Sequence, residues 1–186
     1  MRKLKLQVQM SVDGFIAGPN GEMDWMVWNW DEELLKYVSE ITKSVDCLIL
    51  GRKLAQGFIP HWAELAQTGK EDFAIKMTDT PKVVFTKTLE NSIWENTVLA
   101  KGDLVEEITN LKNKAGDDII VYGGGSFVSS LINAGLIDEF HLFINPSALG
   151  NGMTIFKDLS QRQDLRLKQA RGFDCGIVLQ CYELKK

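Results

Sequence analysis

Hydrophobic and polar residues alternate strictly along residues 3–10. The apolar positions are Leu4, Leu6, Val8 and Met10, and the polar positions are Lys3, Lys5, Gln7 and Gln9. This period of two predicts a strand with one apolar and one polar face. A central strand in a sheet covered on both sides is normally apolar on both faces. Gln7 and Gln9 therefore indicate either a solvated strand or a polar pocket.

Short apolar runs predict the other strands of a sheet. They lie at residues 47–50, 83–86, 97–100, 119–122, 138–144, 166–170 and 177–184. Helical periodicity predicts helices from about 31 to 45, 103 to 116 and 126 to 135, and a short one at 70–77. The last two strands, joined by a glycine-containing turn, predict an antiparallel hairpin. Together these elements predict an α/β fold with a mainly parallel sheet and an antiparallel edge.

Length and composition narrow the class of protein. A chain of 186 residues that is 45% hydrophobic is expected to form a single domain over residues 1–186. The net charge of −4 and the scattered Lys and Arg residues argue against nucleic acid as a partner. We expect no membrane span and no signal sequence, and an odd number of cysteines without a Cys-x-x-Cys pattern indicates the cytoplasm. The two histidines are far apart in sequence, so no metal site is expected.

A glycine run joins a buried strand to a helix near the middle of the chain. The residues of this junction are Tyr122, Gly123, Gly124, Gly125, Ser126 and Phe127. We expect Ser126 to cap the helix, whose free N–H groups and positive dipole end would attract a phosphate. Glycine lets a phosphate approach the backbone closely. The alternative is a tight turn that binds nothing, and the spacing excludes a Rossmann fingerprint, a P-loop and a nucleophile elbow.

Two other predicted strands also end in residues suited to an anion. Gly51, Arg52 and Lys53 follow one strand, and Thr86 and Lys87 follow another. Basic residues at such places are commonly just part of the surface. In an open parallel sheet, however, ligands bind at the carboxyl ends of the strands. The three strand ends can therefore share one ligand.

Five segments resemble those of dihydrofolate reductases, in the same order. They are residues 11–17, 50–53, 84–88, 122–126 and 136–140. Residues 146–152, with Phe156, look more like the reductase domain of bifunctional riboflavin-biosynthesis deaminase-reductases. The resemblance covers nearly the whole chain and is greatest to small stand-alone members of this superfamily. It implies a dihydrofolate reductase-like fold, and homodimers are common among its members.

The resemblance also implies NADPH as the cofactor, bound across the strand ends. The glycine run from Gly123 to Phe127 would hold the pyrophosphate. Arg52 would face the adenosine 2′-phosphate, with Thr86 and Lys87 beside it. A flexible loop containing Asp13, Ile16 and Ala17 would cover the nicotinamide. The chain departs from the family at Leu54 and Phe143, because threonines are common at both positions.

In this resemblance, Gln7 and Gln9 point at a heterocyclic substrate. An amide offers both donors and an acceptor to a ring edge that carries carbonyl and amino groups. The spacing from Trp28 to Glu33 matches the tryptophan and carboxylate of the folate enzymes. Glu33 is therefore the candidate that binds or protonates the ring, and Asp31 is its rival. The alternative is that these carboxylates only stabilise the start of a helix.

We therefore expect an NADPH-dependent reductase of a pyrimidine- or pterin-like heterocycle. Its substrate would be the ribosylaminouracil phosphate of riboflavin synthesis or a dihydropteridine. A substrate phosphate needs a base near the pocket, and the sequence offers only Lys36 and His61 there. The alternatives are a non-catalytic NADPH or ligand sensor and a structural oligomer module.

Overall fold

A single sheet organises the protein. Within residues 1–69, 72–157 and 159–185, which the computed structural model describes, eight strands lie in the order β4-β3-β2-β5-β1-β6-β8-β7. The strands are β1 Leu4–Ser11, β2 Val45–Gly51, β3 Lys82–Phe85, β4 Thr97–Ala100, β5 Asp118–Tyr122, β6 Glu139–Asn145, β7 Leu165–Gly172 and β8 Val178–Leu184. The helices are α1 Glu32–Lys43, α2 Arg52–Gln67, α3 Asp72–Asp79, α4 Leu104–Asn113 and α5 Gly125–Asn133.

The pairing of the strands confirms the predicted fold class. The strands from β4 across to β6 pair in parallel. β8 then pairs antiparallel with β6, and β7 pairs antiparallel with β8. The sheet is thus mainly parallel with an antiparallel C-terminal hairpin at one edge.

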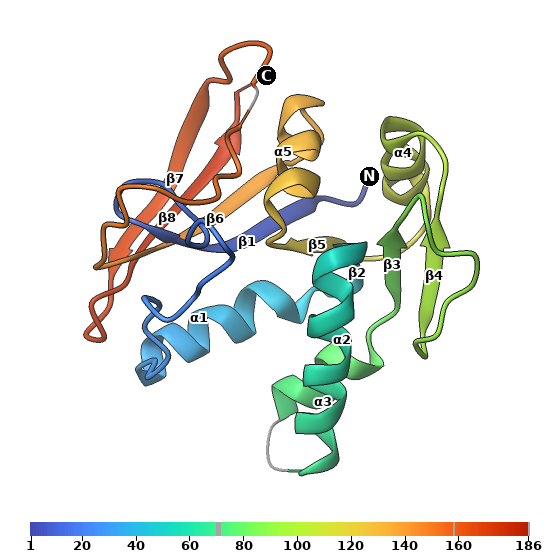
Figure 1. Ribbon diagram of the computed structural model, residues 1–186, viewed down its shortest axis with the longest axis horizontal. Helices are drawn as coiled ribbons and strands as arrows, with labels where there is room; N and C mark the ends of the chain where they lie inside the picture. The colour runs from blue at the N-terminus through green and yellow to red at the C-terminus, as the bar shows by residue number, and fades with distance from the viewer. Residues whose placement is uncertain (70–71, 158, 186) are drawn as a thin grey trace.

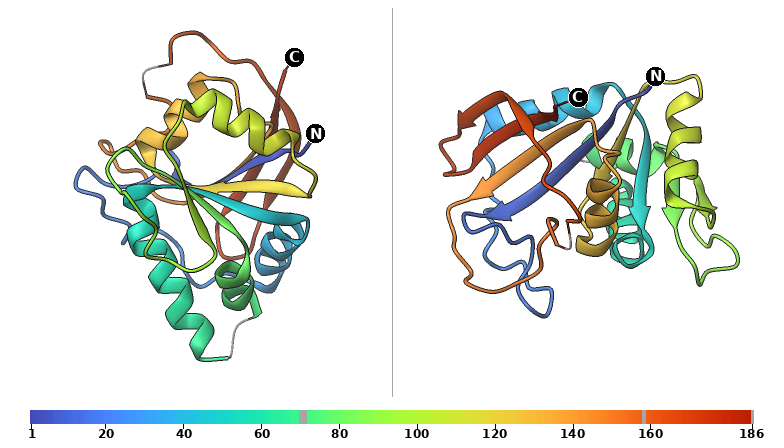
Figure 2. Two further views of the ribbon diagram at one scale, coloured as in Figure 1. Left: turned by 90° about the vertical axis from the view of Figure 1, so that its right-hand side faces the viewer. Right: turned by 90° about the horizontal axis from the view of Figure 1, so that it is seen from above.

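Helices cover both faces of the sheet. α4 and α5 lie on one face, and α1, α2 and α3 lie on the other, as Figure 1 and the turned views of Figure 2 show. The apolar side chains of β1 pack towards α4 and α5 in the largest core cluster. Smaller clusters lie under α1 and under α2 and α3. β1 is therefore a central strand, covered on both sides.

The polar face of β1 is covered by the protein, so of the two alternatives the solvated strand is wrong. Lys5 is 8% exposed and Gln7 is 7% exposed. The Lys5 ammonium donates to the Ser44 hydroxyl at 3.0 Å and lies 2.8 Å from the Asp118 carboxylate. This face turns towards α1 and α2, where β5 and β6 flank it.

Helix α2 was not predicted from the sequence. It runs through Gly57 and Pro60, both poor helix formers, which hide its periodicity. The buried side chains of Ala55 and Ile59 hold it on the sheet. The short helix expected at residues 70–77 is α3, Asp72–Asp79, and its expected first two residues lie outside the described part of the chain.

Helix α4 begins as predicted but ends earlier. Asp103 caps it by accepting the N–H groups of Val105 and Glu106 at 2.9 and 3.1 Å. A second bond at this end of the helix is accepted by the Glu107 carboxylate from the N–H of Gly102, at 3.2 Å. The helix ends at Asn113, before the expected Gly116.

Candidate active site

Four chain segments meet at the carboxyl ends of the parallel strands. A Cβ placed on Gly51, after β2, would lie 3.0 Å from the Cβ of Phe127 in α5. The rings of Phe85 and Phe127 have centroids 5.0 Å apart. A Cβ on Gly125 would lie 3.7 Å from Ile16 of the loop after β1. The strand ends that the sequence singled out are therefore in contact with one another.

The glycine run adopts a backbone that favours glycine. Gly123 has φ = 34° and Gly124 has φ = 83°, both in the left-handed region. Gly124 is the N-cap of α5, and no side chain caps this helix. The expectation that Ser126 caps it is wrong, because the left-handed turn lets the helix start at Gly125. The first N–H groups of α5 thus lack a side-chain acceptor at the point where a phosphate was expected.

The two basic residues after β2 differ in their contacts. Arg52 is half-buried in the first turn of α2, and its guanidinium donates to Gln56 at 3.3 Å. Lys53 beside it is exposed. Leu54 takes the position of the family's threonine and packs within 3.8 Å of a Cβ built on Gly123. Leu54 thus closes the space behind the glycine run without offering a hydrogen bond.

Thr86 and Lys87 already have partners within the chain. The Thr86 hydroxyl is buried and accepts the N–H groups of Thr88 and Leu89, each at 3.1 Å. The Lys87 ammonium donates to the carbonyl of Lys101 at 2.9 Å and to the next carbonyl at 3.0 Å. Both residues hold the loop after β3. A bound phosphate would therefore compete with these hydrogen bonds for the two side chains.

Asp13 ties the loop after β1 to the loop after β6. Its carboxylate accepts the Ser11 hydroxyl at 2.6 Å, the N–H of Gly150 at 2.6 Å and the N–H of Leu149 at 3.0 Å. The Ser11 hydroxyl, and then the Gly150 amide, lower the pKa of Asp13 to about 2. Asp13 is therefore ionised and bonded at neutral pH.

Ile16 and Ala17 add backbone hydrogen bonds between the loops after β1 and β6. Ile16 donates its N–H to the carbonyl of Met153 at 2.8 Å, and Met153 donates to the carbonyl of Ala17 at 2.9 Å. A Cβ on Gly152 would lie only 2.3 Å from that Ala17 carbonyl. Both side chains are buried. Backbone hydrogen bonds join the two loops, and Gly152 permits their close approach because it has no side chain.

On the α1 side of β1, the two predicted substrate residues differ in their bonding. The Gln7 side-chain oxygen is buried and has no hydrogen-bond partner among the residues that the structure describes. The Gln9 oxygen accepts the Asn145 amide at 2.7 Å, and the Asn145 oxygen accepts the N–H of Val27 at 2.8 Å. Gln9 thus holds the segment before α1, whereas Gln7 keeps an acceptor available. Phe143, where the family has a threonine, is fully buried in the core under α1.

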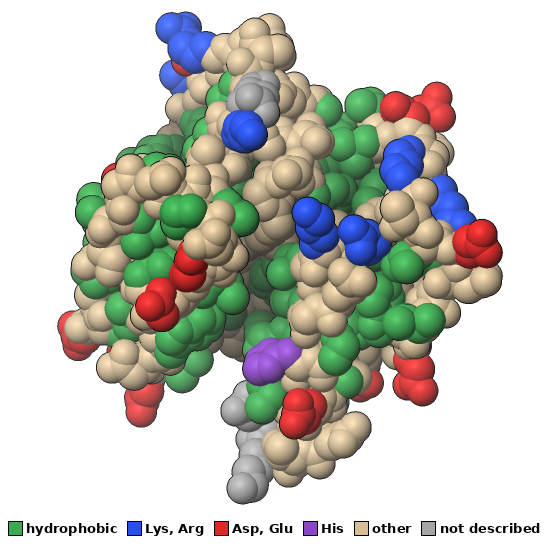
Figure 3. Space-filling model, viewed as in Figure 1, with side chains coloured by type: hydrophobic (Ala, Val, Ile, Leu, Met, Phe, Trp, Pro, Cys, Tyr) green, Lys and Arg blue, Asp and Glu red, His purple; other side chains and the backbone are tan. Residues whose placement is uncertain are grey.

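Aromatic side chains from α2 and α3 line the same side of the sheet. Tyr122, the register partner of Gln7 on β5, stacks on Phe58 with centroids 5.2 Å apart. Trp62 contacts Phe73 edge-on at 5.3 Å. The surface is hollowed between the β6–β8–β7 part of the molecule and helix α2 (Figure 3).

The two candidate carboxylates lie at the start of α1. Glu33 is exposed and forms an ion pair with Arg171 of β7. Asp31 is the N-cap, accepting the N–H of Leu34 at 2.8 Å and that of Cys175 at 3.0 Å. The Cys175 and Leu34 amides lower the pKa of Asp31. Trp28 is 64% exposed. Folding alone explains the contacts of Glu33 and Asp31, so their roles in catalysis stay predictions, as does the role of Trp28 in substrate binding.

Sequence reasoning did not single out the pair formed by Tyr37 and His141. The Tyr37 hydroxyl lies 2.8 Å from Nδ1 of His141, and both side chains are buried. His141 is the register partner of Gln7 on β6. The signal was present in the alternation of β6, which places a histidine on the same face as the glutamine.

A family model described as the RibD C-terminal domain matches residues 2–179 of the chain. The chain belongs to the RibD C-terminal domain family. Among the relatives of this family member, the Bacillus subtilis protein YyaP is 36% identical over 180 residues, which is 95% of this chain and 92% of that protein. The predicted family relationship is thereby confirmed.

Solved structures agree on the fold of this RibD C-terminal domain protein. A riboflavin-biosynthesis protein from Shewanella sp. PV-4 superimposes with a TM-score of 0.74 at 22% identity, over 100% of both chains. The deaminase–reductase of Thermotoga maritima gives 0.71 at 19%, over 99% of this chain and 57% of that one. Dihydrofolate reductase from Enterococcus faecalis gives 0.61 at 17%, over 99% and 97%. At these identities the likeness shows the fold.

Two further findings concern metals and membranes. Within the described residues, no group of three or more His, Cys, Asp or Glu side chains is arranged to hold a metal ion. None of the helices in that part of the chain is both long enough and apolar enough to span a bilayer.

Proposed function

We propose that this protein is an NADPH-dependent reductase that acts on a pyrimidine- or pterin-like heterocycle. Membership of the RibD C-terminal domain family supports a reductase-type function. The solved relatives include a 5-amino-6-(5-phosphoribosylamino)uracil reductase and a dihydrofolate reductase complexed with NADP(H).

The observation that carries the proposal is the glycine run at the meeting point of the strand ends. Gly123 and Gly124 have positive φ, and α5 begins without a side-chain cap. A Cβ on Gly51 would lie only 3.0 Å from that of Phe127, so the glycine suits this close packing. This cradle suits a pyrophosphate, with Arg52 available for the 2′-phosphate. When bound, NADPH supplies the hydride.

The free amide oxygen of Gln7 supports a substrate that presents an N–H donor. A buried acceptor without a partner costs free energy, which a bound donor would recover. Tyr122 and Phe58 offer a flat surface for the ring. Lys36 and His61, the two candidates for a substrate phosphate, are both exposed. The proposal therefore keeps both a phosphorylated and an unphosphorylated heterocycle as substrate.

The proposal is tested by mixing purified protein with NADPH and a panel of dihydropterins and aminouracils. We expect NADPH to bind and one ring class to oxidise it, seen as loss of absorbance at about 340 nm. Comparing the same ring with and without a ribose phosphate tests whether the site binds a substrate phosphate. Absence of any NADPH binding would leave the structural module as the remaining function.

A ligand sensor is the second candidate, and the position of Glu33 favours it. Glu33 pairs with Arg171 at the surface, and Asp31 is engaged as a helix cap. A reductase that relied on either carboxylate would have to break these contacts. Tight NADPH binding without oxidation by any ring of the panel would identify the sensor.

We also propose a cytoplasmic homodimer. β7 forms one edge of the sheet, and most of its residues are exposed. The exposed face of this strand can contact another copy, whereas Arg166, Lys168 and the register shift after Leu167 oppose strand pairing at its edge. Sedimentation of the purified protein is expected to give twice the mass of the chain.

A further inference from the structure

Asn145, the last residue of β6, is fully buried and joins three segments of the chain. Its side-chain oxygen accepts the N–H of Val27, before α1, at 2.8 Å. Its side-chain nitrogen donates to the carbonyl of Phe143 at 3.2 Å and to the side-chain oxygen of Gln9 at 2.7 Å. One amide thus fixes β1, β6 and the segment before α1 to one another.

The backbone partners of Asn145 decide which way its amide points. A backbone N–H can only donate and a carbonyl can only accept. The oxygen of Asn145 must therefore lie towards Val27, and its nitrogen towards Phe143. Because the same nitrogen also meets Gln9, the Gln9 amide has to turn its oxygen towards Asn145. The orientation of both amides thus follows from two backbone groups.

Gln9 in this orientation offers hydrogen-bond donors to a neighbouring molecule. Its side chain is half-buried, and its oxygen is engaged by Asn145. Its amide nitrogen carries two N–H donors and accepts no hydrogen bond. Within the described parts of the chain, no group accepts a hydrogen bond from this nitrogen. The free polar group of Gln9 is therefore a donor.

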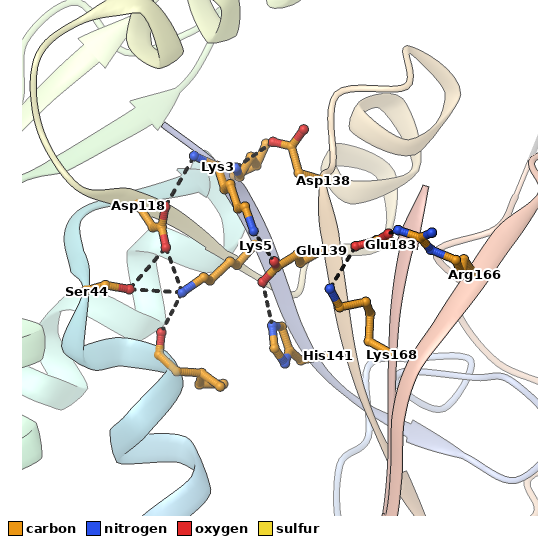
Figure 4. Close-up of polar contacts among 12 residues, drawn as sticks. Lys3, Lys5, Ser44, Asp118, Asp138, Glu139, His141, Arg166, Lys168 and Glu183 are labelled. Carbon is orange, nitrogen blue, oxygen red and sulfur yellow. Dashed lines mark hydrogen bonds and ion pairs between the residues drawn. The ribbon is translucent and has the colours of Figure 1, made fainter. Parts of the chain in front are cut away.

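Ion pairs occupy the charged side chains at the amino-terminal end of the sheet. The Lys5 ammonium lies 2.8 Å from the Asp118 carboxylate, and that of Lys3 lies 2.6 Å from the Glu139 carboxylate. The contact with His141, followed by the ion pair with Lys3, lowers the pKa of Glu139 to about 2. Figure 4 shows these side chains together. They are engaged with one another at the end of the sheet opposite the candidate site.

Gln9 lies towards the candidate site. It is farther along β1 than Gln7, and only Met10 and Ser11 follow it in the strand. The Ser11 hydroxyl donates to Asp13 of the loop after β1 at 2.6 Å. In a parallel sheet, ligands bind at the carboxyl ends of the strands. The free donor of Gln9 is thus at the end of β1 where a ligand is expected.

We propose that Asn145 orients Gln9 as a hydrogen-bond donor, so that the site selects a ring with an acceptor at the edge facing Gln9. The inference rests on the proposed reductase and specifies one edge of its substrate. An oxo group on a pyrimidine or pterin ring accepts from the Gln9 N–H, whereas an amino group at the same place sets donor against donor. Asn145 acts through Gln9 and is therefore a positioning residue. Oxo rings are bound, and their amino counterparts are rejected.

Titration of matched rings in the presence of NADP⁺ tests this selectivity without turnover. The pairs are dihydropterin with 2,4-diaminodihydropteridine, and 6-aminouracil with 6-aminocytosine, each of which exchanges one oxo group for an amino group. We expect the oxo member of at least one pair to bind about tenfold more tightly than the amino member. Equal affinity within both pairs would overturn the selectivity while the reductase stands. If none of these rings binds, the reductase and its selectivity fail together.

Two variants test the amide pair, and both should leave the dissociation constant of NADPH unchanged. Gln9→Glu keeps an acceptor for Asn145 but presents an oxygen to the ring, so it should reverse the preference for the oxo ring. Asn145→Asp still accepts the N–H of Val27 but cannot donate, so the Gln9 amide should turn over and give the same reversal. Gln180→Glu is the matched control, because Gln180 is also half-buried in a strand but shares the opposite face of the sheet with Leu142. Wild-type preference in Gln9→Glu would overturn the role of Gln9, and in Asn145→Asp that of Asn145.

Nitrogen NMR of the ligand-free protein tests the orientation itself and decides the role of Asn145 if Asn145→Asp does not fold. Exchange of the Asn145 side-chain N–H with solvent should quicken about tenfold in Gln9→Leu, which removes its acceptor, relative to the backbone amides of β6. Gln9→Glu should keep the slow exchange, since its carboxylate still accepts. Equal exchange in the wild type and Gln9→Leu would overturn the orientation of the pair.

Discussion

Gln7 and Gln9 lie two residues apart in β1, and their side-chain oxygens have different surroundings. Both lie on the covered face of β1. Within the described part of the chain, the oxygen of Gln7 has no hydrogen-bond partner, whereas that of Gln9 accepts a bond from Asn145. The same substitution at the two positions should therefore have opposite effects on stability.

Gln7→Leu should raise the free energy of unfolding by about 1 kcal/mol, because it removes an unsatisfied buried group. Gln9→Leu should lower it by about 1–3 kcal/mol, because the Asn145 amide loses its acceptor. Urea unfolding of both variants measures the pair. With the reductase substrate, Gln7→Leu should also raise KM about tenfold. A loss of stability in Gln7→Leu would show that its oxygen is satisfied in solution.

Arg52 provides the second prediction at this scale. A hydrogen bond to a charged group contributes about 1.5–3 kcal/mol, so Arg52→Ala should weaken NADPH about ten- to hundredfold. NADH lacks the 2′-phosphate and should bind as before. Lys53→Ala is measured beside it, because Lys53 is the other base predicted at this strand end. Fluorescence titration of the wild type and both variants with NADPH and NADH gives the six dissociation constants. Equal losses for NADPH and NADH would exclude Arg52 from the 2′-phosphate site.

At the scale of elements, two glycines in helical surroundings illustrate different roles. Gly124 is the left-handed N-cap of α5, whereas Gly57 lies exposed in the middle of α2 with no atom near its missing Cβ. The first glycine is required by backbone geometry. The second only weakens its helix.

Gly124→Val should cost about 1–2 kcal/mol of stability and abolish NADPH binding, while the circular dichroism spectrum stays that of a folded protein. Gly57→Ala should add about 0.5–1 kcal/mol and leave NADPH binding unchanged. Calorimetry and cofactor titration on the two variants test this contrast. Normal NADPH affinity in Gly124→Val would reduce the glycine run to a turn.

Some helices and strands were predicted from the sequence and others were not. Alternation in β1 and the apolar runs predicted the sheet, because each reflects burial along a single strand. Helix α2 was missed since Gly57 and Pro60 contradict its periodicity, and only packing of Ala55 and Ile59 holds it. Ser126 was misread as a cap because the left-handed turn before it is a property of backbone geometry. Residue types alone do not specify such a turn.

For the whole molecule, acid stability should reflect the ion pairs at the amino-terminal end of the sheet. The folded-state pKa of Glu139 is about 2, below its ordinary value of 4.5. Its contribution to stability is thus fully present above about pH 4.5 and is lost as pH falls towards about 2. Glu139→Gln should lose less stability than wild type over this range. Urea midpoints at several pH values measure the difference, and parallel curves would contradict it.

The site was less predictable than the fold for a reason that also acts at this scale. Partners such as Arg171 for Glu33 and Asn145 for Gln9 lie more than a hundred residues away. Pairing of β6 and folding back of β7 bring them near. A single sequence shows the residue types of a site, whereas their availability depends on these distant contacts.

The bonds that Asp13 makes to the loop after β6 have a consequence for motion. One carboxylate fastens two loops that are 136 residues apart in sequence, and Met153 continues the seam. Neither loop can move without the other unless the hydrogen bonds of Asp13 and Met153 break. Entry and release at this end of the sheet would therefore follow a single opening event, with one relaxation rate shared by both loops.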